Sequence, residues 1–112
     1  MEGVTGVELA FDPTRPKAAA FLDLYRDEYE TEPVYPGYMA GMYDLMYLIK
    51  DSYEANGGDT TEMMKYYHSL DSWNGAVGEI RWDSQGDPQM AYSIKQIKDG
   101  EIVEVDVYTP GK

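Results

Sequence analysis

Apolar residues recur at the spacing of an α-helix in three stretches before residue 72, and the remainder of the chain alternates as β-strands do. The first helix is predicted from Pro16 or Lys17 to about residue 30, because prolines before and after it are incompatible with a continuous helix. Its apolar positions are expected to face the core. They are Phe21, Leu24, Tyr25 and Tyr29.

A second helix is predicted from about Tyr38 to Ala55, since the Asn56-Gly57-Gly58 run that follows supplies a C-terminal stop. Its apolar stripe is broad, so we expect the helix to be covered on more than one side. The positions that follow the i, i+3, i+4, i+7 pattern are Met39, Met42, Tyr43, Met46, Ile49 and Tyr53.

A third helix follows the second, and a short extended segment over residues 3–11 precedes the first. Asp59 with Glu62 three positions later resembles a capping box, in which a side chain satisfies a free amide at the helix start. This helix is predicted to end near Asp71. No repeat, low-complexity tract or long linker divides the sequence, so residues 1–112 are expected to form a single domain or a fragment of one.

The last third of the chain carries three turn signals between β-type segments, namely Asn74-Gly75, the loop 84–88 and Asp99-Gly100. Asp-Gly between two alternating runs is a strong hairpin signal, because both central residues of a type I′ turn need a positive φ. Strands are therefore predicted over 90–98 and 101–107. The expected fold is of the α/β class, with three helices followed by a β-hairpin region.

The net charge of −12, from 21 acidic and 9 basic residues, limits the classes of partner that the chain is expected to bind. It repels phosphate backbones and anionic lipid, so nucleic-acid binding and docking on a membrane surface are not expected. The chain has no cysteine, which excludes disulfides, thiolate metal sites and cysteine nucleophiles. Residues 1–20 lack the pattern of a signal peptide, so any targeting segment is expected to lie outside this sequence.

Candidate catalytic and metal-binding residues have simpler structural explanations. His68 is the single histidine, and nothing nominates a nucleophile or an orienting partner for it. The Asp83 loop departs from a calcium loop, because its glycine is fourth instead of sixth and Ile94 stands where the last ligand would be. A turn with a flexible Gly86 is favoured. The sequence therefore predicts no catalytic residue, no metal site and no cofactor.

Tyr35 and Tyr38 are the candidate ligand-binding residues. They flank Pro36-Gly37 in the loop that opens the second helix. Free amides at a helix N-terminus beside aromatic rings suit an anionic or zwitterionic small ligand. The alternative is that the two rings pack against the helix entry and hold it in place. Both interpretations are open on the residues alone.

Short motifs along the chain occur in the order in which they occur in extracytoplasmic solute-binding proteins of the leucine/isoleucine/valine-binding type. Together they extend over nearly the whole sequence, which resembles the C-terminal segment of such a protein. The matching motifs are Gly3-Val4 through Phe11-Asp12-Pro13, the Phe-Tyr-Tyr pattern of residues 21–29 with Glu32-Pro33, the helix opening from Tyr38 to Asp44, then Gly75, Gly78, Ile80, Trp82, Asp83 and Gly86-Asp87, and finally Ile97-Lys98-Asp99-Gly100.

The resemblance implies part of a two-lobed type I periplasmic-binding-protein fold, in which a small polar solute is held between two α/β lobes that close about a hinge. It implies a non-enzymatic, periplasmic or extracellular component of an ABC-type importer, membrane-associated through the parent protein, that delivers a branched-chain amino acid or a related solute to a permease. Tyr38 matches the aromatic residue that lies against the solute, with Tyr35 as the alternative for this role. The helices are expected mainly in the first lobe.

The main alternative is a ligand-sensing domain of a receptor or transcriptional regulator with the same fold, and an enzyme is the third possibility. The segments that hold an amino acid's carboxylate and ammonium groups in the family have no counterpart here, so the resemblance specifies a class of solute. A segment taken from two lobes leaves apolar surface uncovered, such as the stripe of the second helix. A homodimer formed by hairpin-edge addition or by helix packing is therefore expected.

Overall fold

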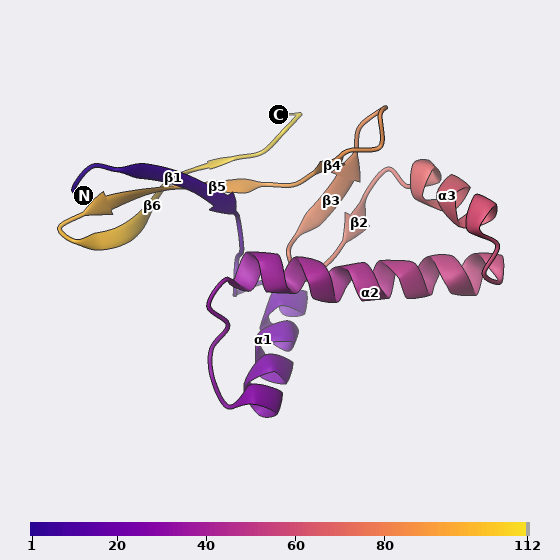
Figure 1. The fold of residues 1–112 in the computed structure, drawn as a ribbon, viewed down its shortest axis with the longest axis horizontal. Coiled ribbons are helices and arrows are strands. Elements are labelled where there is room, and N and C mark those ends of the chain that lie inside the picture. Colours follow the sequence, from indigo (N-terminus) through magenta and orange to yellow (C-terminus); the bar gives the residue numbers. More distant parts are fainter. Residues whose placement is uncertain (112) are drawn as a thin grey trace.

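The computed structural model describes residues 1–111, which form three helices and six strands (Figure 1). The predicted order of helices followed by a β region is confirmed. No described helix is long and apolar enough to cross a membrane. The elements are β1 (Thr5–Leu9), α1 (Pro16–Tyr29), α2 (Pro36–Asn56), α3 (Thr60–Ser69), β2 (Trp73–Asn74), β3 (Glu79–Trp82), β4 (Pro88–Gln89), β5 (Tyr92–Lys98) and β6 (Glu101–Tyr108).

Local signals set the ends of these elements as predicted. α2 ends at Gly57, whose φ of 60° lets its N–H bond back to the Tyr53 carbonyl. α3 begins after Asp59, whose side chain accepts from the Glu62 N–H at 3.0 Å. Asp99 and Gly100 have φ values of 52° and 78°, so the β5–β6 hairpin has positive φ at both central positions of its turn.

The strands form two separate antiparallel sheets, with orders β1-β5-β6 and β2-β3-β4. The N-terminal strand thus pairs with the C-terminal hairpin, from Thr5 opposite Gln96 to Leu9 opposite Tyr92. The β1-β5-β6 sheet lies at one end of the molecule, and the helices and the smaller sheet lie at the other (Figure 1). Two connections, residues 10–15 and 90–91, join the two parts.

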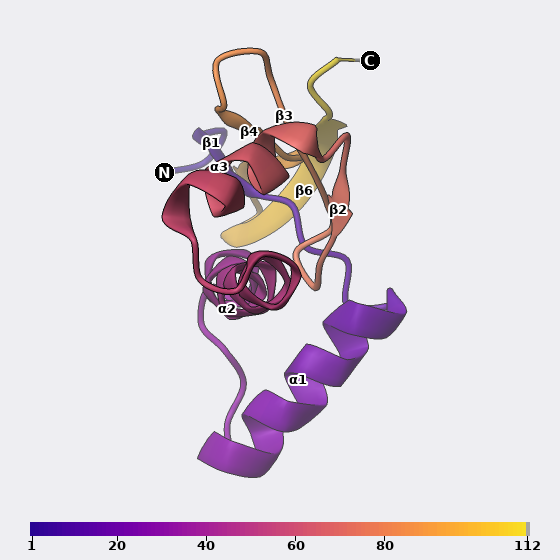
Figure 2. The same cartoon turned by 90° about the vertical axis from the view of Figure 1, so that its right-hand side faces the viewer.

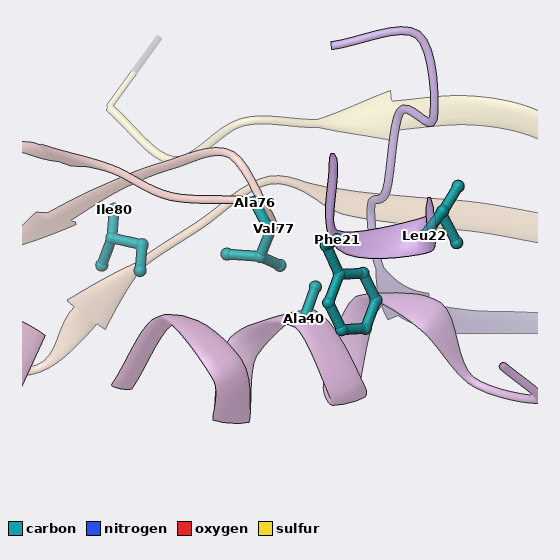
Figure 3. Packing of buried hydrophobic residues seen from close by; sticks show 6 residues of the cluster. All are labelled: Phe21, Leu22, Ala40, Ala76, Val77 and Ile80. Carbon is teal, nitrogen blue, oxygen red and sulfur yellow. The ribbon is translucent and has the colours of Figure 1, made fainter. Parts of the chain in front are cut away.

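The core is small and lies between α1, α2 and the β2–β3 hairpin (Figure 3). Phe21 is its largest member, and its ring is 6.3 Å from that of Phe11 and 5.3 Å from that of Tyr43. Such edge-on and tilted ring pairs are the favoured aromatic geometries. The fully buried apolar cluster consists of Phe21, Leu22, Ala40, Ala76, Val77 and Ile80.

The buried face of α2 is not the one that the apolar pattern predicts. The helix buries a row of small, polar and single aliphatic residues spaced at i, i+3 or i+4, while most of its large apolar residues are exposed. The β2–β3 turn approaches α2 closely, and only short side chains fit between them. The short separation between turn and helix therefore decides which face is buried, and the hydrophobicity of the side chains does not. The buried row is Gly37, Ala40, Asp44, Leu48 and Ser52. The exposed large apolar residues are Tyr47, which lies on the side of α1 and β2, and a set termed the α2 stripe: Tyr38, Met42, Leu45, Met46, Ile49 and Tyr53.

Asp44 fastens the β2–β3 turn to α2. Its buried carboxylate accepts from the Ala76 N–H at 2.7 Å and the Val77 N–H at 2.8 Å. Gly75 lies so close that an added Cβ would be 2.3 Å from the Asp44 Oδ2 atom. From the residue that precedes α1, the Arg15 guanidinium donates to the Gly75 carbonyl at 3.3 Å. The turn is therefore held from α2 and from the residue before α1 by charge-assisted hydrogen bonds.

Candidate functional site

A hollow of about 320 Å³ lies where the first turn of α2 faces the β1-β5-β6 sheet. The loop before α2 and its first residues form one wall, and side chains from all three strands form the other. Tyr35 and Tyr38 both line this hollow, so the structure brings the two sequence-predicted site residues together. One wall of the hollow belongs to the helical part of the chain and the other to the β1-β5-β6 sheet, so the hollow lies between the two parts.

The rings of Tyr35 and Tyr38 are free to contact a ligand. The two residues are 61% and 51% exposed, respectively, so half or more of each residue's surface is accessible. No side chain caps the start of α2, and Pro36 at its first position has no N–H. The amides of Gly37 and Tyr38 are therefore at the uncapped, electropositive end of the helix.

The sheet side of the hollow carries both signs of charge. Lys95 on β5 pairs with Glu8 on β1. Ser93, which is almost fully buried, donates its hydroxyl hydrogen to the Glu104 carboxylate on β6 at 2.5 Å. A carboxylate ligand is thus favoured near the helix amides and Lys95, and an ammonium group near Glu8 and Glu104. The arrangement suits binding of a small zwitterion.

Gly37 sets the distance between α2 and the end of β1. A Cβ atom at this position would be 2.9 Å from the Leu9 carbonyl oxygen and 3.2 Å from the Leu9 Cβ. Both atoms belong to Leu9 on β1, which forms part of the opposite wall of the hollow. A side chain at position 37 would therefore push α2 away from β1. This contact explains why glycine follows proline at the helix start.

We expect Gly37→Ala to lower the free energy of unfolding by about 1–3 kcal/mol, because backbone must move to admit the methyl group. Gly41→Ala is the matched control, since it lies one turn later in α2 with no atom within 4 Å of the added Cβ. The control should stabilise by about 0.5–1 kcal/mol through helix propensity. Urea denaturation measures both, and equal effects of the two substitutions would contradict the close contact.

The other sequence candidates occupy structural positions. The Asp83 Oδ1 atom accepts from the Gln85 N–H at 2.9 Å and the Asp87 N–H at 3.0 Å, which confirms the turn interpretation of this loop. His68 is exposed on α3. Within residues 1–111, no group of three or more histidine, aspartate or glutamate side chains is placed to hold a metal ion.

A second hollow, of about 280 Å³, opens between α1, α2 and β2. The Tyr43 hydroxyl donates to the Tyr47 hydroxyl at 3.4 Å, and this bond, together with burial, raises the pKa of Tyr43 to about 12. The Lys17 ammonium lies 5.3 Å from the centre of the Trp73 ring, and the Trp73 indole donates to Asp51 at 3.3 Å. These side chains satisfy one another, so we assign this hollow a packing role.

Sequence reasoning missed the structural importance of Asp44. The sequence did contain a signal for this role, because Asp44 is an acidic residue in the middle of the most apolar helix of the chain. A charge is buried only where it is paired or hydrogen-bonded, so the position required a partner. The partner is a pair of backbone amides more than thirty residues away, which no sequence pattern specifies.

No family model matches the sequence, and no curated protein matches it. Several solved structures are similar to this chain. A leucine-binding protein from Thermotoga maritima is 25% identical with a TM-score of 0.76, over 97% of this chain and 31% of that one. A substrate-binding protein of an ABC transporter from Desulfitobacterium hafniense, in complex with leucine, is 26% identical with a TM-score of 0.69, over 93% of this chain and 31% of that one.

A third similar structure is the branched-chain amino-acid transporter substrate-binding protein LivJ from Streptococcus pneumoniae in complex with isoleucine, at 22% identity and a TM-score of 0.72. It matches over 95% of this chain and 30% of that one. This chain therefore spans about a third of the length of the structures it resembles. The resemblance predicted from the motifs is confirmed: the fold matches a segment of the type I periplasmic-binding fold of branched-chain amino-acid-binding proteins.

Proposed function

We propose that this chain forms part of the solute-binding component of an ABC-type importer and contributes one section of the cleft that holds a branched-chain amino acid or a related small polar solute. The single observation that carries the proposal is the hollow between α2 and the β1-β5-β6 sheet, with Tyr35 and Tyr38 at its mouth. In this proposal Tyr38 contacts the solute's side chain, and Tyr35 closes the same side of the hollow.

The similar structures support the class of solute. Two of them are complexes with leucine and isoleucine, and each of these ligands has a carboxylate, an ammonium group and an apolar side chain. The hollow offers a counterpart to each, namely the α2 amides with Lys95, the carboxylates Glu8 and Glu104, and the two tyrosine rings. We infer that the two parts of the chain approach each other when solute binds.

The proposed partners follow from the same role. The full binding component would deliver its solute to an ABC permease, from a periplasmic or extracellular location. The chain by itself would form a homodimer, because its apolar surface lacks a cover. The alternative of a ligand-sensing domain of a receptor or regulator stays a prediction from the sequence.

Solute binding by the chain itself is testable with ¹⁵N-labelled protein and NMR titration with leucine and isoleucine. The dissociation constant is expected to be about millimolar or weaker, since each ~1.4 kcal/mol of lost contact costs tenfold in affinity and a cleft between two complete lobes has contacts that this chain lacks. Shifts should concentrate on the amides of Tyr35, Gly37 and Tyr38. Micromolar affinity would contradict a cleft shared with further lobe elements, and saturation without shifts at these amides would overturn the site.

Tyr38→Ala should weaken this binding about tenfold or more, the scale of a lost aromatic contact. Tyr29→Ala is the matched control, because Tyr29 is a similarly exposed tyrosine at the end of α1 and lies outside both the hollow and the α2 stripe. The control should bind leucine as the unaltered chain does. If the two variants lose affinity equally, Tyr38 is not a solute contact.

A further inference from the structure

The chain exposes more surface than a compact protein of its size. Its accessible area is 7730 Å², whereas a folded monomer of 12.7 kDa exposes about 6200 Å². Its Cα radius of gyration is 16.3 Å, against about 13 Å for a compact domain of this length. The excess of roughly 1500 Å² exceeds the ~800 Å² that each partner contributes to a standard stable interface. The excess area is large enough for a standard interface.

Much of the exposed apolar surface is collected on one face of α2. The α2 stripe runs from Tyr38 to Tyr53 and contains no charged side chain, although the chain has a net charge of −12. Figure 2, viewed along α2, shows α1, α3 and the β2–β3 hairpin around other sides of the helix, and one side with no helix or strand against it. Leu45 and Ile49, at the edge of the stripe, also line a hollow shared with α3 and β3. An exposed apolar helix face on a strongly acidic chain is typical of an interface.

The spacing of the stripe is symmetric about its own midpoint, which lies between Leu45 and Met46. Positions 38 and 53 are equally far from this midpoint, as are positions 42 and 49. A second α2 laid antiparallel across the first would therefore oppose tyrosine with tyrosine at the ends and aliphatic with aliphatic in the middle. A two-fold interface requires this relation, in which residue i contacts residue j and j contacts i.

We propose that the α2 stripe is the interface of a two-fold symmetric homodimer in which two α2 helices pack antiparallel. Tyr38 then lies against Tyr53 of the second copy, Met42 against Ile49, and Leu45 against Met46. This inference rests on the self-association within the proposed function, and it shares Tyr38 with the proposed solute contact.

Pairing through the edges of the β1-β5-β6 sheet is the competing arrangement, and charge disfavours it. The outer strand β6 carries Glu101, Glu104 and Asp106, and the other edge strand carries Glu8. Two copies meeting at these edges would bring carboxylates together, which is how natural edge strands avoid association. The α2 stripe presents no such repulsion.

Light scattering coupled to gel filtration, with sedimentation equilibrium for the affinity, tests the proposal on the chain as it is. The unaltered chain should be a dimer. Met46→Glu should raise the dimer's dissociation constant at least about a hundredfold, because it buries unpaired carboxylates on the symmetry axis. Ile102→Glu is the control: Ile102 is 73% exposed on β6 and Met46 is 66% exposed, and this substitution should leave the dimer intact. Tyr38 is untouched, so the result does not depend on its role in solute binding.

Orientation is tested by disulfide formation, since the chain has no cysteine to interfere. A tagged Met42→Cys chain mixed with an untagged Ile49→Cys chain should form the mixed disulfide in preference to either like pair, as only the antiparallel arrangement brings these positions together. This measurement also serves if Met46→Glu fails to fold. A monomeric unaltered chain, a dimer unaffected by Met46→Glu but broken by Ile102→Glu, or preferential Met42→Cys self-linkage would each overturn the proposal. A monomer would assign the stripe to a different polypeptide segment.

Discussion

Asp44→Ala is expected to lower the free energy of unfolding by about 3–5 kcal/mol, the cost of removing one side of a buried charged hydrogen-bond set. Asp44 is 2% exposed, and its two carboxylate oxygens are the acceptors for the Ala76 and Val77 amides. Without them, two amides in the buried turn lose their partner, and water cannot replace it where Gly75 packs against the helix. Loss of cooperative thermal unfolding, followed by circular dichroism, measures the effect.

Asp51→Ala provides the matched control for this change. It removes the same side chain from the same helix two turns later, where the carboxylate accepts only a 3.3 Å bond from the Trp73 indole. Both substitutions improve helix propensity equally, so any difference reports the turn contacts. The control should cost no more than about 1 kcal/mol. Equal losses in the two variants would mean that Asp44 does not fasten the turn.

Phe21→Ala is expected to cost about 3–5 kcal/mol, because it removes the largest side chain of a small core and leaves a cavity. Phe21 is 5% exposed and contacts the rings of Phe11, Tyr25 and Tyr43. These rings join α1, α2 and the connection that leads from β1. The loss should therefore release the helices from the sheet and reduce protection of their amides from hydrogen exchange.

Leu24→Ala separates this cavity effect from a general loss of apolar surface on α1. Leu24 is 54% exposed on the same helix, although the helical pattern of the sequence places it with Phe21. Its replacement should cost about 1 kcal/mol or less. If Leu24→Ala destabilises the chain as strongly as Phe21→Ala, the face of α1 that packs against the core is not the one described here.

Some features of the structure depend on local sequence, and others depend on contacts between distant segments. Helix ends, the Asp59 cap and the Asp99-Gly100 turn were predictable, because each rests on groups within four residues of one another. Tyr35 and Tyr38 were also recognisable as candidates from their position beside a proline-glycine helix start. Their placement opposite Lys95 and Glu104 was not, because it depends on β1 pairing with β5, which is more than eighty residues away.

The sequence by itself determined the class of the fold, the order of its elements and the family that it resembles, since motif order and short-range turn chemistry carry that information. Only the tertiary structure decided which face of α2 is buried. Apolar periodicity favours the face with methionine and tyrosine, yet the buried face consists largely of glycine, alanine, serine and Asp44. The physical reason is that a backbone turn can approach a helix closely only over short side chains, and a carboxylate at the contact can satisfy the amides of that turn. The large residues then face outward and are exposed.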